Sequence, residues 1–326
     1  MEDTMNGTTT VQLAEKTAKA VTGSVEEWTG FLQSAARLYK YSYPEQLLIY
    51  AQRPDATACA SYEIWNQTMR RYVRRGARGI ALPDGAGAVR YVFDVADTGA
   101  RKSSREVKTW SLDENNLEAV AHALETQYGS AAKLGIAGQL EEIAMQQSMD
   151  YWQWHQDELR GIVDGSFLEG YDELNLEIAF RNTAAASVKY MLLSRCNLAR
   201  EYQIEPEELA GVLEWNTSAA SGALGRAVSE LSEGVLRQIE RTIRQYERSQ
   251  NHDERTDVYE ERRVLDSQPD SSRTVGDTEQ IRTDAGMVSE GASDDHLQQP
   301  APEREADRAP DGDRSGGGES DGGDRA

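Results

Sequence analysis

Residues 31–84 read FLQSAARLYKYSYPEQLLIYAQRPDATACASYEIWNQTMRRYVRRGARGIALPD, and the spacing of the apolar residues changes within this stretch. Its first part has helical spacing, whereas its last part has the period of two that is typical of strands. Pro44 suits the first turn of a helix that Arg53 and Pro54 would end. The stretch therefore predicts a small α+β fold.

A further helix is predicted to begin just before this stretch. Ser24-Val25-Glu26-Glu27 has the pattern of a capping box, in which Ser24 caps the helix and Glu27 reaches back. The apolar residues that follow at helical spacing are Trp28, Phe31, Leu32, Ala35, Leu38 and Tyr39. A short helix is also expected over residues 62–66.

An arginine-rich run separates two apolar segments, residues 72–73 and 80–82. Because its glycines permit positive φ angles in a turn, we predict a β-hairpin with the arginines at its tip. Alternating apolar residues over 89–93 predict a third strand, and a fourth is expected over 107–110. Residues 24–110 form the predicted α+β domain.

The rest of the chain divides by composition. Helical periodicity predicts an acidic, all-helical domain over residues 111–248, with helices at 113–128, 133–155, 184–197 and 206–246. Residues 249–326 carry 21 acidic and 9 basic residues and almost no aromatic ones, so we predict a disordered acidic tail. Residues 1–23 are expected to be a flexible N-terminal segment.

The net charge of -21 hides segments of opposite sign. Residues 34–108 contain 13 basic and 7 acidic residues, whereas residues 109–248 contain 11 and 23. Screening confines each patch to about 8 to 10 Å, so binding of phosphates depends on the local potential. The basic segment is therefore where a nucleic acid would bind.

The sequence lacks the patterns of several protein classes. It contains no run of about 18 apolar residues and no signal peptide at its start, so we expect a cytoplasmic protein without a membrane span. It also contains no HExxH, no GxxxxGK[ST] and no GxGxxG motif. Cys59 and Cys196 are interpreted as buried thiols. These observations predict a non-enzymatic protein with no metal and no cofactor.

The candidate site combines guanidinium groups with aromatic rings. Five arginines within nine residues suit backbone phosphates, because each offers a planar fork of donors: Arg70, Arg71, Arg74, Arg75 and Arg78. Tyr41 and Tyr43 lie in a helix break and are predicted to be exposed, so that they can stack on unpaired bases. Gln46 and Arg53 are expected to orient those bases. The alternative is a solvated hairpin that serves only solubility.

The quoted stretch, followed by VRYVFDVADT at residues 89–98, resembles the N-terminal domain of ArdC-type antirestriction proteins. The similarity is to the divergent form that opens large multidomain proteins of conjugative elements in Firmicutes, and it covers about residues 24–100. The residues that carry it are Gln46, Leu47 and Leu48, Ala56 and Thr57 after Arg53-Pro54, Trp65, and Gly76 and Gly79 leading into Ile80.

This resemblance implies binding of single-stranded DNA. ArdC itself continues into a protease-like domain with an HExxH helix, which this sequence lacks, so no peptidase activity carries over. The large relatives continue into methylase and helicase domains, so the chain is expected to be a short version or the front piece of a longer protein.

Residues and resemblance together predict a mobile-element-associated, antirestriction-like protein that binds single-stranded DNA. Element-encoded transfer or replication proteins are further candidate partners. The alternative is a protein-interaction adaptor whose acidic helical region binds a basic partner.

Overall fold

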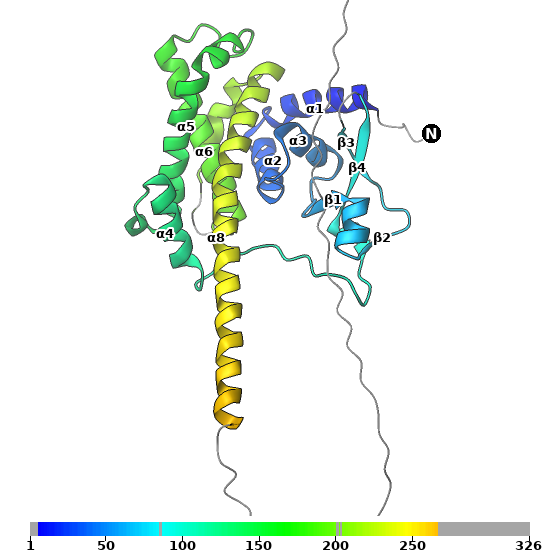
Figure 1. Ribbon diagram of the computed structural model, residues 1–326. Coiled ribbons are helices and arrows are strands. Elements are labelled where there is room, and N and C mark those ends of the chain that lie inside the picture. The colour runs from blue at the N-terminus through cyan, green and yellow to red at the C-terminus, as the bar shows by residue number, and fades with distance from the viewer. Residues whose placement is uncertain (1–5, 85–86, 200–201, 203, 267–326) are drawn as a thin grey trace, which may run out of the picture. The chain divides into compact units, whose positions relative to one another are not determined.

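The computed structural model describes residues 6–84, 87–199, 202 and 204–266, and it is mixed α+β, mostly helical, with small antiparallel sheets (Figure 1). The helices are α1 (Gly7–Val21), α2 (Val25–Arg37), α3 (Tyr43–Gln52), α4 (Leu117–Tyr128), α5 (Gly135–Gly161), α6 (Glu173–Arg195), α7 (Pro206–Leu209) and α8 (Ser218–Asp266). The strands are β1 (Cys59–Ser61), β2 (Tyr72–Val73), β3 (Ile80–Pro83), β4 (Val89–Asp94) and β5 (Thr98–Gly99). Short helical turns are η1 (Ile64–Thr68), η2 (Val95–Asp97), η3 (Ala132–Leu134) and η4 (Ala210–Glu214).

Helix α1 corrects the prediction that residues 1–23 are flexible. Asn6 caps this helix, because its side-chain oxygen accepts a hydrogen bond of 2.9 Å from the backbone N–H of Thr9. Ala18 and Val21 are buried in the core, and the helix packs against α3 and α8. Because most residues near the start of the chain are polar, the sequence shows no clear sign of this short apolar face.

The two helices predicted around the helix break are confirmed. Ser24 caps α2 by accepting a hydrogen bond from the N–H of Glu27, and the predicted apolar face is buried. Ser42 and Glu45 form a capping box at the start of α3, with Pro44 in its first turn. The short helix predicted at 62–66 is present: residues 62–63 are helical and continue into the π-helical turn η1.

The predicted hairpin across the arginine run is wrong. Strand β2 pairs with β5, placing Tyr72 opposite Gly99, whereas β3 pairs with β4 and β4 pairs with β1. The run therefore joins two different sheets, and the hairpin turn lies between β3 and β4. The third predicted strand is confirmed as β4, but residues 107–110 form no strand. Trp110 in that segment is buried instead.

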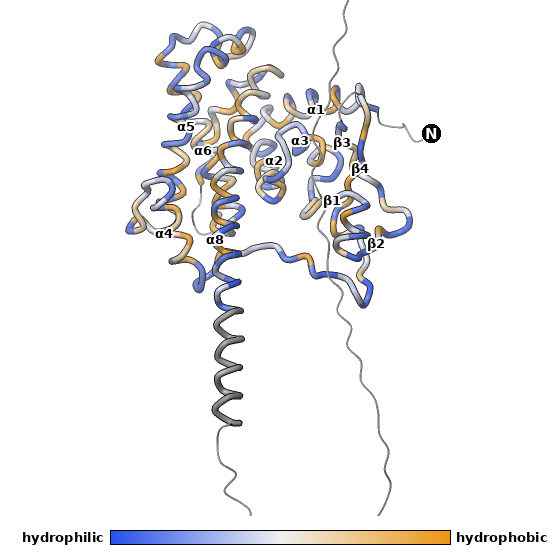
Figure 2. Tube along the Cα trace, in the orientation of Figure 1, coloured by the Kyte–Doolittle hydropathy of each residue, from blue (hydrophilic) through white to orange (hydrophobic). Residues whose placement is uncertain are grey.

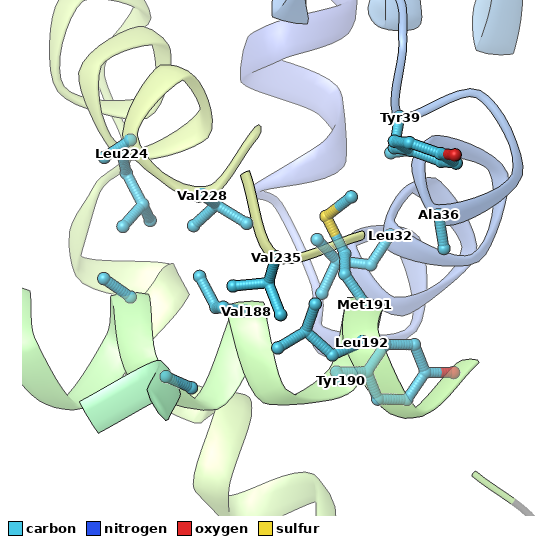
Figure 3. Packing of buried hydrophobic residues seen from close by; sticks show 14 of the residues in the cluster. Leu32, Ala36, Tyr39, Val188, Tyr190, Met191, Leu192, Leu224, Val228 and Val235 are labelled. Carbon is cyan, nitrogen blue, oxygen red and sulfur yellow. The ribbon is translucent and has the colours of Figure 1, made fainter. Parts of the chain in front are cut away.

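One hydrophobic core joins the two predicted domains. It takes residues from α1, α2 and α3 as well as from α4, α5, α6 and α8. Figure 3 shows Leu32 of α2 beside Met191 of α6, with Val235 of α8 in the same cluster. A smaller cluster lies between α3 and the buried face of β3 and β4. The boundary predicted at residue 110 thus falls inside a shared core.

The helical region agrees in part with its prediction. Helix α6 begins at Glu173, eleven residues before the predicted start, and the helical stretch predicted over 206–246 is divided into α7, η4 and α8. The tail was predicted to begin at 249, but α8 continues to Asp266. The remainder of the predicted tail lies outside the described residues. None of the described helices is long and apolar enough to cross a membrane.

A buried carboxylate ties α8 to the end of α2. Glu240, which is 7% exposed, accepts hydrogen bonds from Tyr39 (2.5 Å), Lys40 (2.7 Å) and Arg244 (2.9 Å). Burial raises the pKa of this carboxyl, but these donors outweigh burial and hold its pKa at about 2, below the ordinary 4.5. The ionised form of Glu240 is therefore the one that stabilises the fold.

Replacing Glu240 with glutamine is expected to lower the free energy of unfolding at pH 7 by about 3 kcal/mol. Because the pKa is lowered by folding, the contribution of Glu240 is complete above pH 4.5 and is lost as the pH falls towards 2. Urea unfolding of both proteins at pH 7, 5 and 3 measures this, and the difference between their free energies of unfolding should fall to roughly half at pH 3. A gap that stays constant with pH would contradict the prediction.

Candidate nucleic-acid interface

The arginine run forms an exposed loop between β2 and β3. Its tip is a turn in which the N–H of Ala77 donates to the carbonyl of Arg74 at 3.1 Å. Gly76 has a φ of 84°, as the third residue of a type II turn requires, and this places Arg75 at the exposed corner. The N–H of Arg74 donates to the carbonyl of Asp97, which fixes the loop to the neighbouring η2 turn.

A second basic segment lies beside this loop. The N–H of Arg105 donates to the carbonyl of Met69 at 2.9 Å, and Ser104 Oγ donates to the carbonyl of Arg70 at 2.7 Å. These bonds bring Arg101, Lys102 and Arg105 next to the arginine run. These residues were not predicted as part of the site, although the run RKSSR at 101–105 is a visible signal in the sequence.

We call the combined cationic area the basic surface. Its residues are Arg70, Arg71, Arg74, Arg75, Arg78, Arg101, Lys102 and Arg105. Figure 2 shows the hydrophilic colouring of both segments around β2. Arg71 donates to Thr98 Oγ1 and Arg74 to the carbonyl of Ala96, but none of the eight forms an ion pair with a described carboxylate. The surface therefore keeps its positive charge.

Two exposed aromatic rings lie in and next to the basic surface. Tyr72 is 42% exposed, and the guanidinium carbon of Arg101 lies 5.5 Å from its ring centroid. Tyr91 on β4 is 44% exposed. It alternates with buried Val92, so it points away from the packed face of the sheet. These rings are available for stacking, unlike Trp65, which is buried.

Arg53, predicted to orient bases, supports the basic surface from below. Its guanidinium pairs with the carboxylate of Asp97, whose backbone carbonyl holds the arginine loop. The preceding corner is fixed by buried Asp94, which accepts hydrogen bonds from the N–H groups of Thr57 (2.7 Å) and Ala96 (2.9 Å). Arg53 is thus a positioning residue for the loop.

Two other predicted site residues, Tyr43 and Gln46, belong to the interior, and a third, Tyr41, is partly covered, which corrects their assignment. Tyr43 is only 4% exposed because its ring packs against Gly225 of α8. Gln46 is 1% exposed and donates to the carbonyl of Tyr41 at 2.8 Å. Tyr41 is half-buried and donates to the carbonyl of Cys59. The break between α2 and α3 would leave these side chains exposed if the segment stood alone, but α8 and β1 cover it in the folded protein.

The two cysteines lie where their thiols stay protonated. Burial raises the pKa of the Cys59 and Cys196 thiols to about 12, so neither is a reactive thiolate at neutral pH. Cys196 is buried as predicted, whereas Cys59 is half-buried. Within the described part of the chain, no three His, Cys, Asp or Glu side chains gather closely enough to hold a metal ion.

The five predicted arginines thus lie together on one surface, and three further cations join them. Comparisons with protein-family models, with curated proteins and with solved structures find no match for this chain. The resemblance to ArdC-type domains stays a prediction based on the residues that carry it.

Proposed function

We propose that the protein binds single-stranded DNA through the basic surface. The observation that carries the proposal is the gathering of eight cations around exposed Tyr72, none of which forms an ion pair with a described carboxylate. Arginine forks bind phosphate oxygens well, and release of counterions from DNA supplies most of the affinity. The resemblance to ArdC-type domains supports a mobile-element setting with antirestriction-like activity.

The exposed rings favour single strands over duplex. Stacking on an aromatic side chain contributes about 1 to 3 kcal/mol per base, and the bases of a duplex are not free to make it. Tyr72 and Tyr91 are 42% and 44% exposed, so each offers part of a ring face. Phosphate contacts hold a strand without reading its sequence, so affinity should depend only weakly on sequence.

The full chain is expected to bind a single-stranded oligonucleotide about tenfold more tightly than a duplex of the same length. Fluorescence anisotropy with labelled oligonucleotides measures both affinities. Four engaged phosphates would give a slope of log affinity against log salt of about -3 on a single strand. Equal affinity for both forms, or no binding at low salt, would refute the proposal.

A protein-interaction adaptor is the competing candidate. A cleft of 510 Å³ among α5, α6, α7 and η4 favours it, because glutamates outnumber cations there. Its charged lining residues are Glu141, Glu207, Glu208, Glu214 and Lys189. Exposed Met145, at 56%, adds an adaptable apolar contact. Failure to bind DNA together with saturable binding of a basic amphipathic peptide would favour this candidate.

A further inference from the structure

Two adjoining clefts lie where the ends of α2 and α6 meet residues 107–110, and we call them together the seam cleft. The larger has a volume of 520 Å³ and the smaller 200 Å³. Both are lined by Arg37, Thr57, Thr109 and Arg195. The larger is otherwise lined by Gln33, Ala36, Ser194, Asn197 and Ala199. No acidic residue is among these, and only two alanines are apolar.

The charge of the seam cleft is strongly positive. The smaller part adds three cations and one carboxylate, namely Lys40, Lys108, Arg244 and Glu240. With Arg37 and Arg195 this makes five cations against one carboxylate, a net of +4. The ends of α2 and α6 each contribute about -0.5 from the helix dipole, so about +3 remains. This is unusual in a chain whose net charge is -21.

Neutral groups hold the two shared arginines in place. Arg37 donates to the carbonyls of Ala56 and Pro54, each at 2.9 Å. Arg195 donates to the carbonyl of Trp110 at 3.0 Å, and its guanidinium lies 3.4 Å from the centroid of that ring. These contacts leave part of each five-donor fork unused and cancel none of its charge.

Neither shared arginine forms an ion pair with a described carboxylate. Burial lowers the pKa of both guanidinium groups. Asp55 and Asp94 act in the opposite direction on the pKa of Arg37, and Tyr39, Cys196 and Glu240 on that of Arg195, but burial outweighs them. An anion entering the cleft would supply the missing counter-charge.

We propose that the seam cleft binds the phosphate group of a nucleotide. Its volume lies in the range of small-ligand sites, about 300 to 1,000 Å³, and arginine forks match the oxygens of a phosphate monoester. Hydroxyl and amide groups of Thr109, Gln33 and Asn197 line the same space as neutral partners. The phosphate comes either from a free nucleotide or from the end of a DNA strand.

The strand-end form rests on the proposed function and on the path of the chain. Thr109 follows Arg105 of the basic surface by four residues, so the two Cα atoms are at most about 14 Å apart. A strand held on the basic surface could therefore extend its terminal phosphate into the seam cleft.

The first experiment measures phosphate binding by thermal shift of the full chain. At 10 mM, sodium phosphate, pyrophosphate and deoxyadenosine monophosphate are expected to raise the Tm by about 2 to 4 °C over sodium chloride of equal ionic strength. Thr109→Glu places a carboxylate in the cleft and should remove this shift. The exposed-site control Thr126→Glu on α4 should keep it.

The isosteric variant Gln33→Glu repeats this test with a smaller disturbance. No shift in the wild type, or a shift that survives both Thr109→Glu and Gln33→Glu, would overturn the proposal.

The second experiment separates the two sources of phosphate. Oligonucleotides with a 5′-phosphate, a 3′-phosphate or hydroxyl ends are compared by anisotropy. A threefold or larger preference for one phosphorylated end, lost in Thr109→Glu, assigns the seam cleft to strand ends. A thermal shift without any end preference assigns it to free nucleotides. If the wild type shows the shift but binds no DNA, the proposed function fails and the seam cleft stands.

Discussion

Replacing Arg70, Arg75 and Arg78 together with glutamate is expected to reduce affinity for single-stranded DNA at least about a hundredfold and to leave the Tm nearly unchanged. These three side chains are exposed and donate no hydrogen bond to a described residue, so the fold does not depend on them. Exposed substitutions of this kind usually change stability by less than about 0.5 kcal/mol each. Loss of three phosphate contacts should also reduce the salt slope by about 2.

A matched control tests whether position or total charge causes the loss. Lys133, Arg241 and Arg248 are exposed cations of the helical region, and their reversal changes the net charge by the same amount. This control should bind within about threefold of wild type, because screening confines each charge to about 8 Å. Equal losses in the two variants would show that binding follows net charge and would exclude the basic surface as the site.

Replacing Gly225 with alanine is expected to lower the free energy of unfolding by about 2 to 4 kcal/mol. A Cβ at this position would lie 2.1 Å from the ring of Tyr43, so α3 and α8 would have to separate. Extra atoms in a packed core typically cost about 1 to 3 kcal/mol and occasionally more, and because this contact is only 2.1 Å long we expect a cost of about 3 to 5 kcal/mol. The gain of about 1 kcal/mol in helix propensity offsets only part of the cost.

Gly234 in the same helix provides the control, because its replacement with alanine should raise the free energy of unfolding where Gly225→Ala lowers it. A Cβ there meets no atom within 4 Å, so Gly234→Ala should stabilise the protein by about 0.5 to 1 kcal/mol. Urea unfolding measures both variants. At a temperature where Gly225→Ala remains folded, its DNA affinity should equal that of wild type, since Tyr43 belongs to the core. A stable Gly225→Ala protein would contradict the packing of α3 against α8.

Local signals in the sequence predicted those elements whose cause is local. The cap at Ser24, the proline in the first turn of α3 and the alternation along β4 each act within a few residues, and each is confirmed. Helix α1 was not predicted because polar threonines occupy part of its buried face. Thr10 and Thr17 can lie there because their hydroxyls donate hydrogen bonds to backbone carbonyls of the same helix.

Strand pairing and side-chain exposure depended on partners far away in the sequence. Strand β2 consists of only two residues, Tyr72 and Val73. Nothing in the local sequence distinguishes β5 from β3 as its partner strand. Likewise, Tyr43 looks exposed in a helix break until α8 covers it from about 180 residues away. The arginines could be predicted as a charged group, but their juxtaposition with residues 101–105 could not.

Because the shared core includes residues of α8, it cannot be completed during synthesis until this helix has been made. Tyr39 and its partner Glu240 are separated by 201 residues, which a ribosome adds in about 10 to 40 s at 5 to 20 residues per second. For that time the parts of the core that pack against α8, on α1 and later on α4 and α6, lack this helix, whose 49 residues come last among the described helices. The nascent chain therefore presents an apolar helix face to other chains and to chaperones for tens of seconds. A ribosome that stalls before α8 would release a product with an open core.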